Sequence, residues 1–279
     1  MKTRIEKITP IMAKLYIESN YGKQRNLSES HVVHLAQQMK AGQWECNGEP
    51  IIFDENDNLI DGQHRLNAVI RSGVAIDTLV VTGVKQSSFV TINSGKSRSN
   101  SDVFSIKGTA NYNNIATCVN GVMNYRRALK VTKTVIDGEA RWTQIGGSLN
   151  ASVRPSKIDM IKEYESHADK YQQSIHLASR SKKIMKMGPL SIIAAMALID
   201  GAHQDFVAPF FIMLANGIFP HENHPAYRLK CRFEQNKSSK LKLSSNMLLL
   251  LTAKAWNFYA LEKECKVLRV DSEIAFPIQ

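Results

Sequence analysis

Four short stretches in the first third of the chain have the pattern of strands, and in one of them, residues 4–10, apolar and polar residues alternate as in a half-buried strand. Strand patterns cover residues 4–10, 50–54, 59–60 and 76–84. Elsewhere apolar residues recur every three or four positions, as on a helix with one buried face. Helix patterns cover 27–44 and 61–73. Ser28 is the expected N-cap of the first helix, and Gly42 and Gly73 stand where glycine commonly ends a helix.

Helix patterns dominate the remainder of the chain. Residues 86–106 are polar and rich in turn-forming residues, so we expect a loop there. Helices are expected at 111–130, 156–181, 189–201, 203–216, 224–236 and 244–264, and a loop or hairpin at 132–152. The sequence therefore predicts an α+β fold, with an N-terminal α+β domain at 1–107 and a mostly α-helical C-terminal domain at 108–279.

Positive charge is concentrated in the second predicted domain. The chain holds 36 Lys and Arg against 25 Asp and Glu, a net charge of +11. Residues 1–106 hold 12 basic and 11 acidic residues (+1), and residues 107–279 hold 24 and 14 (+10). A one-sided surplus of this size indicates a polyanionic partner, and we expect DNA. The alternative is a basic surface that only keeps the protein soluble.

The sequence gives no indication of a membrane protein, a secreted protein or a redox protein. No run of about 18 apolar residues occurs, and the first ten residues lack the apolar core of a signal peptide, so we expect a cytoplasmic protein that does not contact a membrane. Cys46, Cys118, Cys231 and Cys265 are far apart and form no CxxC pair. We therefore expect reduced thiols, and neither a zinc site nor a redox dithiol.

The stretch LIDGQHRLNAVIRSG places three hydrogen-bonding side chains on the first turn of a predicted buried helix. Such a turn has free backbone N–H groups and a partial positive charge, and both favour a phosphate. Gly62 allows close approach of the backbone, and Gln63 can orient a ligand. Arg65 offers a fork of donors that matches phosphate oxygens, and Asp61 and His64 are the candidate catalytic groups. The competing interpretation is a tight turn in which Arg65 forms a salt bridge with Asp61.

A longer pattern surrounds this turn. Its parts are Gln24-Arg25, a helix at 28–41, Gly42, Pro50-Ile51 at a strand, and Gly62 to Arg65 with Ala68 on the next helix. The arrangement resembles the nucleotide-binding N-terminal domain of the ParB/sulfiredoxin-like superfamily over about residues 5–106. The motif DGQHR and the later segment FVTINSGKSRSNSD resemble those of the DGQHR-domain branch. This branch includes DndB-like proteins of DNA phosphorothioation systems and ParB-like phage proteins. The resemblance implies that fold, a nucleotide or phosphate site, and a phage or mobile-element origin with a bacterial host cell.

At the Gly62 turn the sequence differs from two groups of this superfamily, and each difference limits the activities that the resemblance implies. Sulfiredoxins carry a catalytic Cys in the corresponding Gly-Cys-His-Arg turn, where this chain has Gln63, so peroxiredoxin repair is not expected. Partition ParB proteins carry Gly-Glu-Arg-Arg, and here Gln63 and His64 replace the Glu and the first Arg. One charge of each sign is lost, which weakens the case for their CTP-clamp chemistry. The second domain also shows no recognisable helix-turn-helix.

Residues outside the turn are further candidates for phosphate contacts. Asn93, Lys96 and Arg98 follow the last expected strand and could reach the phosphates held at Arg65, the alternative being a solvated loop. Contacts to a nucleic-acid backbone are expected from two basic runs, through Arg180, Lys182, Lys183, Lys186, Arg228 and Arg232. Any one such run, taken alone, is more often a solvated helix face than a binding surface.

One short loop has the residue types of a metal site. His221, Glu222 and His224 could approach a cation, but the loop offers no rigid helical face and no distant third ligand is evident, so no metal site is expected. A histidine-rich connection between helices is the simpler interpretation.

We therefore expect a ParB-like nucleotide- and DNA-binding protein that acts in DNA modification or its regulation. A nucleoside triphosphate with Mg²⁺ is the cofactor implied at the Gly62 turn, and a homodimer is compatible with this function. One alternative is an enzyme at the same pocket, a nuclease or a nucleotide-dependent phosphotransferase, which would need a metal-binding carboxylate such as Asp61, Asp102 or Glu49. The other is a partner-binding phage protein whose pocket has degenerated.

Overall fold

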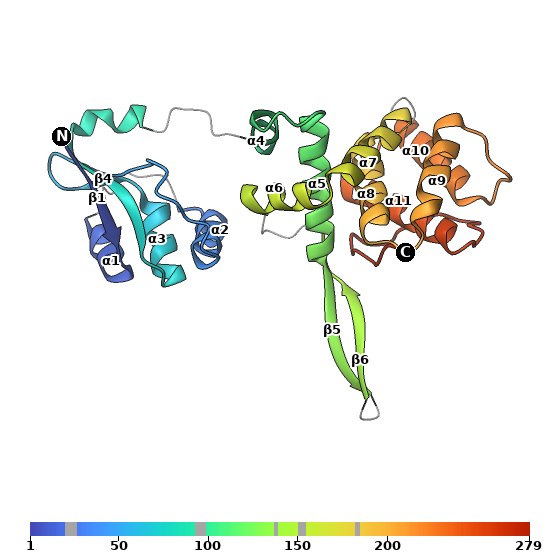
Figure 1. Cartoon of the computed structure of the whole chain (residues 1–279), viewed down its shortest axis with the longest axis horizontal. Helices are drawn as coiled ribbons and strands as arrows, with labels where there is room; N and C mark the ends of the chain where they lie inside the picture. The colour runs from blue at the N-terminus through green and yellow to red at the C-terminus, as the bar shows by residue number, and fades with distance from the viewer. Residues whose placement is uncertain (20–26, 93–98, 137–138, 150–154, 182–184) are drawn as a thin grey trace. The chain divides into compact units, whose positions relative to one another are not determined.

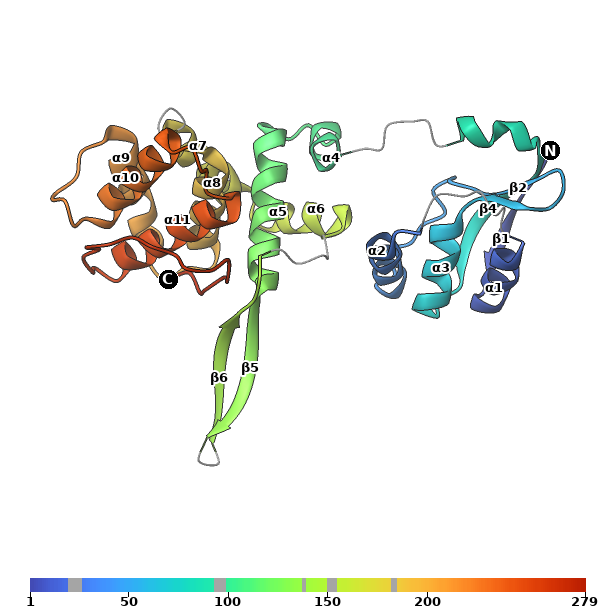
Figure 2. The same ribbon diagram turned by 180° about the vertical axis from the view of Figure 1, so that it is seen from behind.

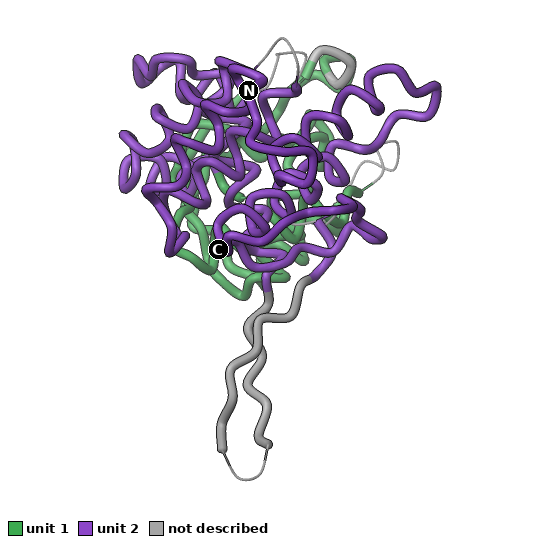
Figure 3. The backbone as a smooth tube through the Cα atoms, turned by 90° about the vertical axis from the view of Figure 1, so that its right-hand side faces the viewer, with its two compact units in different colours: residues 1–97, 152–156 green, residues 98–151, 157–279 purple. Residues whose placement is uncertain are grey.

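The computed structural model describes residues 1–19, 27–92, 99–136, 139–149, 155–181 and 185–279 (Figure 1). The chain forms two compact units, residues 1–97 with 152–156 and residues 98–151 with 157–279 (Figure 3). The described residues contain eleven α-helices and a four-stranded open mixed sheet, so the expectation of mixed α and β structure is confirmed. The division between the units falls at 97/98, whereas the sequence suggested 107/108.

The first unit is built on a mixed sheet with the strand order β1-β4-β2-β3. Its strands are β1 (Lys2–Ile8), β2 (Ile51–Asp54), β3 (Leu59–Asp61) and β4 (Ile76–Val84). β1 and β4 are antiparallel, β4 and β2 are parallel, and β2 and β3 are antiparallel. Each of these strands coincides with or overlaps a stretch in which the sequence predicts a strand.

Three helices complete the first unit: α1 (Pro10–Glu18), α2 (Glu29–Lys40) and α3 (Gln63–Ser72). α3 packs against both α1 and α2. One hydrophobic core joins them to the sheet, with Ala13, Val32, Met39, Leu66, Val69, Ile51, Phe53 and Val80 among its buried members. α2 and α3 agree with the predicted periodicity. α1 was not expected: Pro10 ends the strand as predicted, but it also occupies the first turn of a helix capped by the Thr9 side chain.

The loop expected at 86–106 is partly helical, which corrects the prediction. The 3-10 helix η1 (Gln86–Thr91) follows β4, and α4 (Asn100–Ile106) is the first helix of the second unit. The side chain of Ser99 accepts from the Asp102 N–H while Asp102 accepts from the Ser99 N–H, a capping box that stabilises the start of α4.

The rest of the second unit is helical except for one hairpin. After α5 (Tyr112–Ala128), strands β5 (Leu129–Ile136) and β6 (Glu139–Gly146) pair antiparallel, so the open choice between loop and hairpin resolves to a hairpin. The remaining elements are α6 (Lys157–Ser166), α7 (Ala168–Arg180), α8 (Met187–Ile199), η2 (Gln204–Phe206), α9 (Val207–Asn216), α10 (Pro225–Ser238) and α11 (Ser245–Ala260). The single helix expected at 156–181 is therefore two, separated at His167. α8 starts before Gly188-Pro189 rather than after it, because proline is tolerated in a first helical turn.

α8 is the centre of this unit and is buried along almost its whole length. It packs against α5, α7, α9 and α11. On α5, Gly121 lies directly against the side chain of Ile192, where any larger residue would clash. The guanidinium of Arg126 on α5 bonds to Asp200 after α8 and to Glu163 on α6, so one cation ties three segments together.

The segment after α11 returns along that helix, as Figures 1 and 2 both show. Asn257 Nδ2 donates to the Pro277 carbonyl at 2.7 Å, and Trp256 Nε1 donates to the Gln279 carbonyl at 2.8 Å. The Tyr125 hydroxyl of α5 donates to the Phe276 carbonyl at 2.8 Å. These bonds hold the tail against the helical core. Within the described ranges, no helix is both long and apolar enough to cross a membrane.

Candidate functional site

The turn between β3 and α3 requires glycine at position 62. Gly62 is the N-cap of α3 and has φ +107°, a left-handed conformation that other residues adopt only with strain. A Cβ atom at this position would stand 3.1 Å from Ile51 Cγ1 and 3.3 Å from Ile51 Cα. Glycine is thus demanded by the backbone and by close approach to β2, independently of any ligand.

Arg65 is held by two carboxylates. Its Nη2 lies 2.9 Å from Asp61 Oδ2, and its Nη1 lies 3.3 Å from Glu49 Oε2. The Arg65 and Asp61 side chains are only 11% and 14% exposed, whereas Glu49 is 73% exposed. This is the salt-bridge arrangement that the sequence left as the competing interpretation. A phosphate at Arg65 would have to displace or share these partners.

His64 and Gln63 are buried in the first turn of α3. The backbone N–H of Ser28 donates to His64 Nε2 at 3.0 Å, and the ring centroids of His64 and His31 are 5.3 Å apart. His64 therefore joins the start of α2 to the start of α3. Ser28 is the N-cap of α2 as expected, although no side-chain capping bond forms there. Both candidate catalytic groups, Asp61 and His64, are engaged in contacts within the protein.

Several expected phosphate contacts cannot be placed. Arg25, Asn93, Lys96 and Arg98 lie outside the described residues, and so do Lys182 and Lys183. Of the carboxylates considered for metal binding, Glu49 contacts Arg65, and Asp102 belongs to the second unit, where it caps α4. In the portion of the chain that the structure covers, no group of three or more His, Cys, Asp or Glu side chains is arranged to hold a metal ion.

His224 has a structural role as the N-cap of α10. Its Nδ1 accepts from the Ala226 N–H at 3.3 Å. Burial, assisted by the nearby His221, lowers the pKa of His224 below its ordinary value. His221 and His224 line a cavity of about 340 Å³ together with Tyr259 and Glu262. Of the three residues with metal-like spacing, His224 thus serves as a helix cap.

The four cysteines are free thiols. Cys118 and Cys265 are buried, Cys231 is half-buried and Cys46 is exposed. Burial raises the pKa of the Cys118 thiol to about 12, although contacts with Ser174 and Ser191 oppose the shift. A thiol with a raised pKa stays protonated near neutral pH, and Cys118 packs within the hydrophobic core of the second unit.

Four of the expected nucleic-acid contacts are described, and all lie in the second unit. Arg180 at the end of α7 and Lys186 before α8 are exposed, whereas Arg228 and Arg232 are half-buried on α10. Arg228 and Arg232 are four residues apart, which places them one turn apart on the same face of the helix.

Arg228 and Arg232 donate to neutral side chains, whereas Arg4, Arg65, Arg71 and Arg126 pair with carboxylates. Arg228 Nη2 donates to Asn223 Oδ1 at 3.0 Å and Arg232 Nη1 to Gln235 Oε1 at 3.1 Å, both neutral acceptors. Neither forms an ion pair with a described carboxylate. The Nε atoms of both are buried and lack an acceptor among the described residues.

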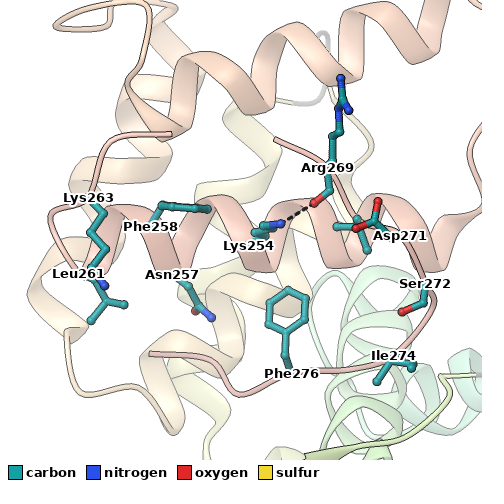
Figure 4. A pocket seen from close by; sticks show the side chains of 11 residues that line it. Lys254, Asn257, Phe258, Leu261, Lys263, Arg269, Asp271, Ser272, Ile274 and Phe276 are labelled. Carbon is teal, nitrogen blue, oxygen red and sulfur yellow. Dashed lines mark hydrogen bonds between the residues drawn. The ribbon is translucent and has the colours of Figure 1, made fainter. Parts of the chain in front are cut away.

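A cavity that sequence reasoning did not anticipate lies between α11 and the tail. It measures about 440 Å³, and Figure 4 shows the side chains around it. Its lining is Lys254, Asn257, Phe258, Leu261, Lys263, Arg269, Val270, Asp271, Ser272, Ile274 and Phe276. No local motif marks these positions, because the cavity forms only when the tail folds back over the helix.

Known proteins give no independent indication of what this site does. Comparisons with protein-family models, with curated proteins and with solved structures find no match to the chain.

Proposed function

We propose that the chain is a DNA-binding protein whose second unit contacts the phosphate backbone through α10. The observation that carries the proposal is the pair Arg228 and Arg232, which lie one turn apart on α10, are half-buried and have no carboxylate partner in the described part. Guanidinium groups of this kind suit phosphate oxygens, which can accept two parallel bonds from each.

The surroundings of the pair support the same partner. Residues 228–242 hold Arg228, Lys230, Arg232, Lys237, Lys240 and Lys242 against the single acidic residue Glu234. Glu234 lies 3.9 Å from Lys230 and leaves the two arginines uncompensated. A surface that served only for solubility would be expected to mix charges of both signs. Contacts of this type give affinity without sequence choice, so we expect weak discrimination between DNA sequences.

The ParB-like resemblance and a nucleotide site at Gly62 to Arg65 stay predictions. The contacts of Arg65 with Asp61 and Glu49 favour, for this turn, the alternative of a pocket that now serves the structure of the first unit. In our proposal DNA binding therefore depends on α10 and does not require Arg65.

Fluorescence anisotropy with a labelled mixed-sequence duplex tests the proposal. The chain should bind at about 50 mM salt, and log K should fall linearly with log salt, by about 0.9 for each phosphate contact. The double variant Arg228→Gln, Arg232→Gln should flatten this slope by one to two contacts and weaken binding by about tenfold or more.

The matched control is Arg4→Gln with Arg71→Gln. These arginines of the first unit are paired with Glu6 and Glu29, and their removal changes the net charge by the same amount. The control should leave the slope nearly unchanged. Absence of binding at about 50 mM salt, or equal losses in both double variants, would overturn the proposal.

A further inference from the structure

The cavity between α11 and the tail combines an apolar wall with a basic rim. Phe258 and Leu261 come from the end of α11, and Val270, Ile274 and Phe276 come from the tail. Leu261 and Ile274 are exposed to solvent although they are large and apolar. A bound apolar group would remove part of this surface from water, which is favourable.

Three cations and one carboxylate complete the lining. Lys254, Lys263 and Arg269 line the cavity together with a single Asp271, an excess of two positive charges. None of the three cations forms an ion pair with any carboxylate that the structure describes. Lys254 Nζ donates to the Arg269 carbonyl at 2.8 Å, the bond drawn in Figure 4, so its ammonium is held against the tail. An ammonium has three donors, and two remain for a ligand.

We propose that this cavity binds a small aromatic anion of the nucleoside monophosphate class. The volume of about 440 Å³ falls in the range of small-molecule sites. The ring would pack against Phe258 and Phe276, and the phosphate would meet Lys254 and Lys263. A duplex backbone offers phosphates but keeps its bases stacked inside, so an intact duplex matches only half of this lining. The site is independent of the DNA surface proposed on α10.

Isothermal titration calorimetry of the full chain tests the aromatic contacts and the phosphate contacts of the proposed ligand separately. The probes are AMP, which carries both ring and phosphate, adenosine, which lacks the phosphate, and inorganic phosphate, which lacks the ring. AMP should bind at least about tenfold more tightly than either of the others, because each loses one set of contacts. Equal affinity for AMP and inorganic phosphate would overturn the aromatic half, and equal affinity for AMP and adenosine would overturn the anionic half.

Variants locate the site. Lys263→Ala with Arg269→Ala removes two exposed cations of the rim and should weaken AMP binding by about tenfold or more. The control, Lys162→Ala with Lys266→Ala, removes two exposed cations that lie outside both the cavity and the basic segment 228–242, and it should leave AMP affinity unchanged. Equal loss in both would mean attraction by net charge alone and would overturn the proposal.

Arg65→Ala distinguishes this cavity from the Gly62 turn. We expect AMP binding to survive that change, since Arg65 belongs to the first unit and the cavity to the second. If Arg65→Ala abolishes AMP binding and the rim variant does not, the nucleotide binds at the turn and the cavity proposal is wrong. Failure of duplex binding with retained AMP binding would affect only the function proposed for α10.

Discussion

The guanidinium of Arg65 and the carboxylate of Asp61 form a largely buried ion pair across the Gly62 turn, with 2.9 Å between Nη2 and Oδ2. Asp61 is the last residue of β3, and Arg65 lies in the first turn of α3. The pair therefore ties the end of a strand to the start of the helix that follows it. Glu49 adds a second, exposed contact from the segment before β2.

Removal of either partner of this pair should destabilise the first unit. Arg65→Ala leaves the Asp61 carboxylate without its cation, and we expect both Arg65→Ala and Asp61→Ala to lower the free energy of unfolding by about 3 kcal/mol. Glu49→Gln is the matched control and should cost less than about 1 kcal/mol, since Glu49 is exposed. Urea unfolding of the three variants measures these differences. A stable Arg65→Ala protein that has lost nucleotide binding would instead support a phosphate site.

Gly62→Ala should be more harmful than the same change at the other end of α3. Position 62 combines φ +107° with a close approach to Ile51, so strain and a clash add together, and we expect a loss of about 2–4 kcal/mol. Gly73 also has a left-handed φ, of +74°, but a Cβ there meets nothing within 4 Å. Gly73→Ala should therefore cost only about 1 kcal/mol. Thermal melts of both variants give the comparison, and equal losses would show that the contact with Ile51 is unimportant.

Acidification should weaken the second unit through His224. Because the pKa of folded His224 lies below the ordinary value of 6.5, the unfolded chain takes up its proton first as the pH falls. The contribution of neutral His224 to the free energy of unfolding is therefore fully present above pH 6.5, and it is lost as the pH falls from there through the folded pKa. His224→Asn keeps a side chain that can cap α10 and should flatten this part of the profile.

His176→Asn is the control for that measurement, because His176 is exposed on α7. Unfolding free energies measured between about pH 5 and 7.5 should show a shallower pH dependence in His224→Asn than in His176→Asn. If the free energy of unfolding depends on pH in the same way in both variants, His224 is not the cause of the loss of stability in acid.

Arg126→Lys should destabilise the helical unit although it conserves the charge. Asp200 accepts from Arg126 Nε and Nη2 at 2.7 and 2.9 Å, and Glu163 accepts from Nη1 at 2.7 Å. A single ammonium cannot reproduce this fork, so we expect a loss of about 1–3 kcal/mol. Lys107→Ala breaks the exposed pair with Glu165 and should cost less than about 1 kcal/mol. Chemical denaturation that gave equal small effects would contradict the bracing role of Arg126.

Local periodicity was sufficient for much of the first unit. β4 spans 76–84 as predicted, and α2 and α3 begin and end within a few residues of the expected positions, because alternation, helical spacing and terminal glycines are properties of the neighbouring residues. α4 was missed although a signal was available, since Ser99 and Asp102 have the spacing of a capping box. α1 has only Ala13 fully buried, so its pattern was too short to predict.

The sequence by itself determined the mixed α and β composition, the glycine turn at 62 and the concentration of positive charge in the second part of the chain. It also restricted Arg65 to two roles, phosphate ligand or partner of Asp61. Only the tertiary structure brought Glu49 to Arg65 and the N–H of Ser28 to His64, and only the return of the tail over α11 created the cavity beside Lys254. The physical reason is that hydrogen bonds and cavities depend on distances between residues far apart in the chain, whereas periodicity and capping depend on neighbours.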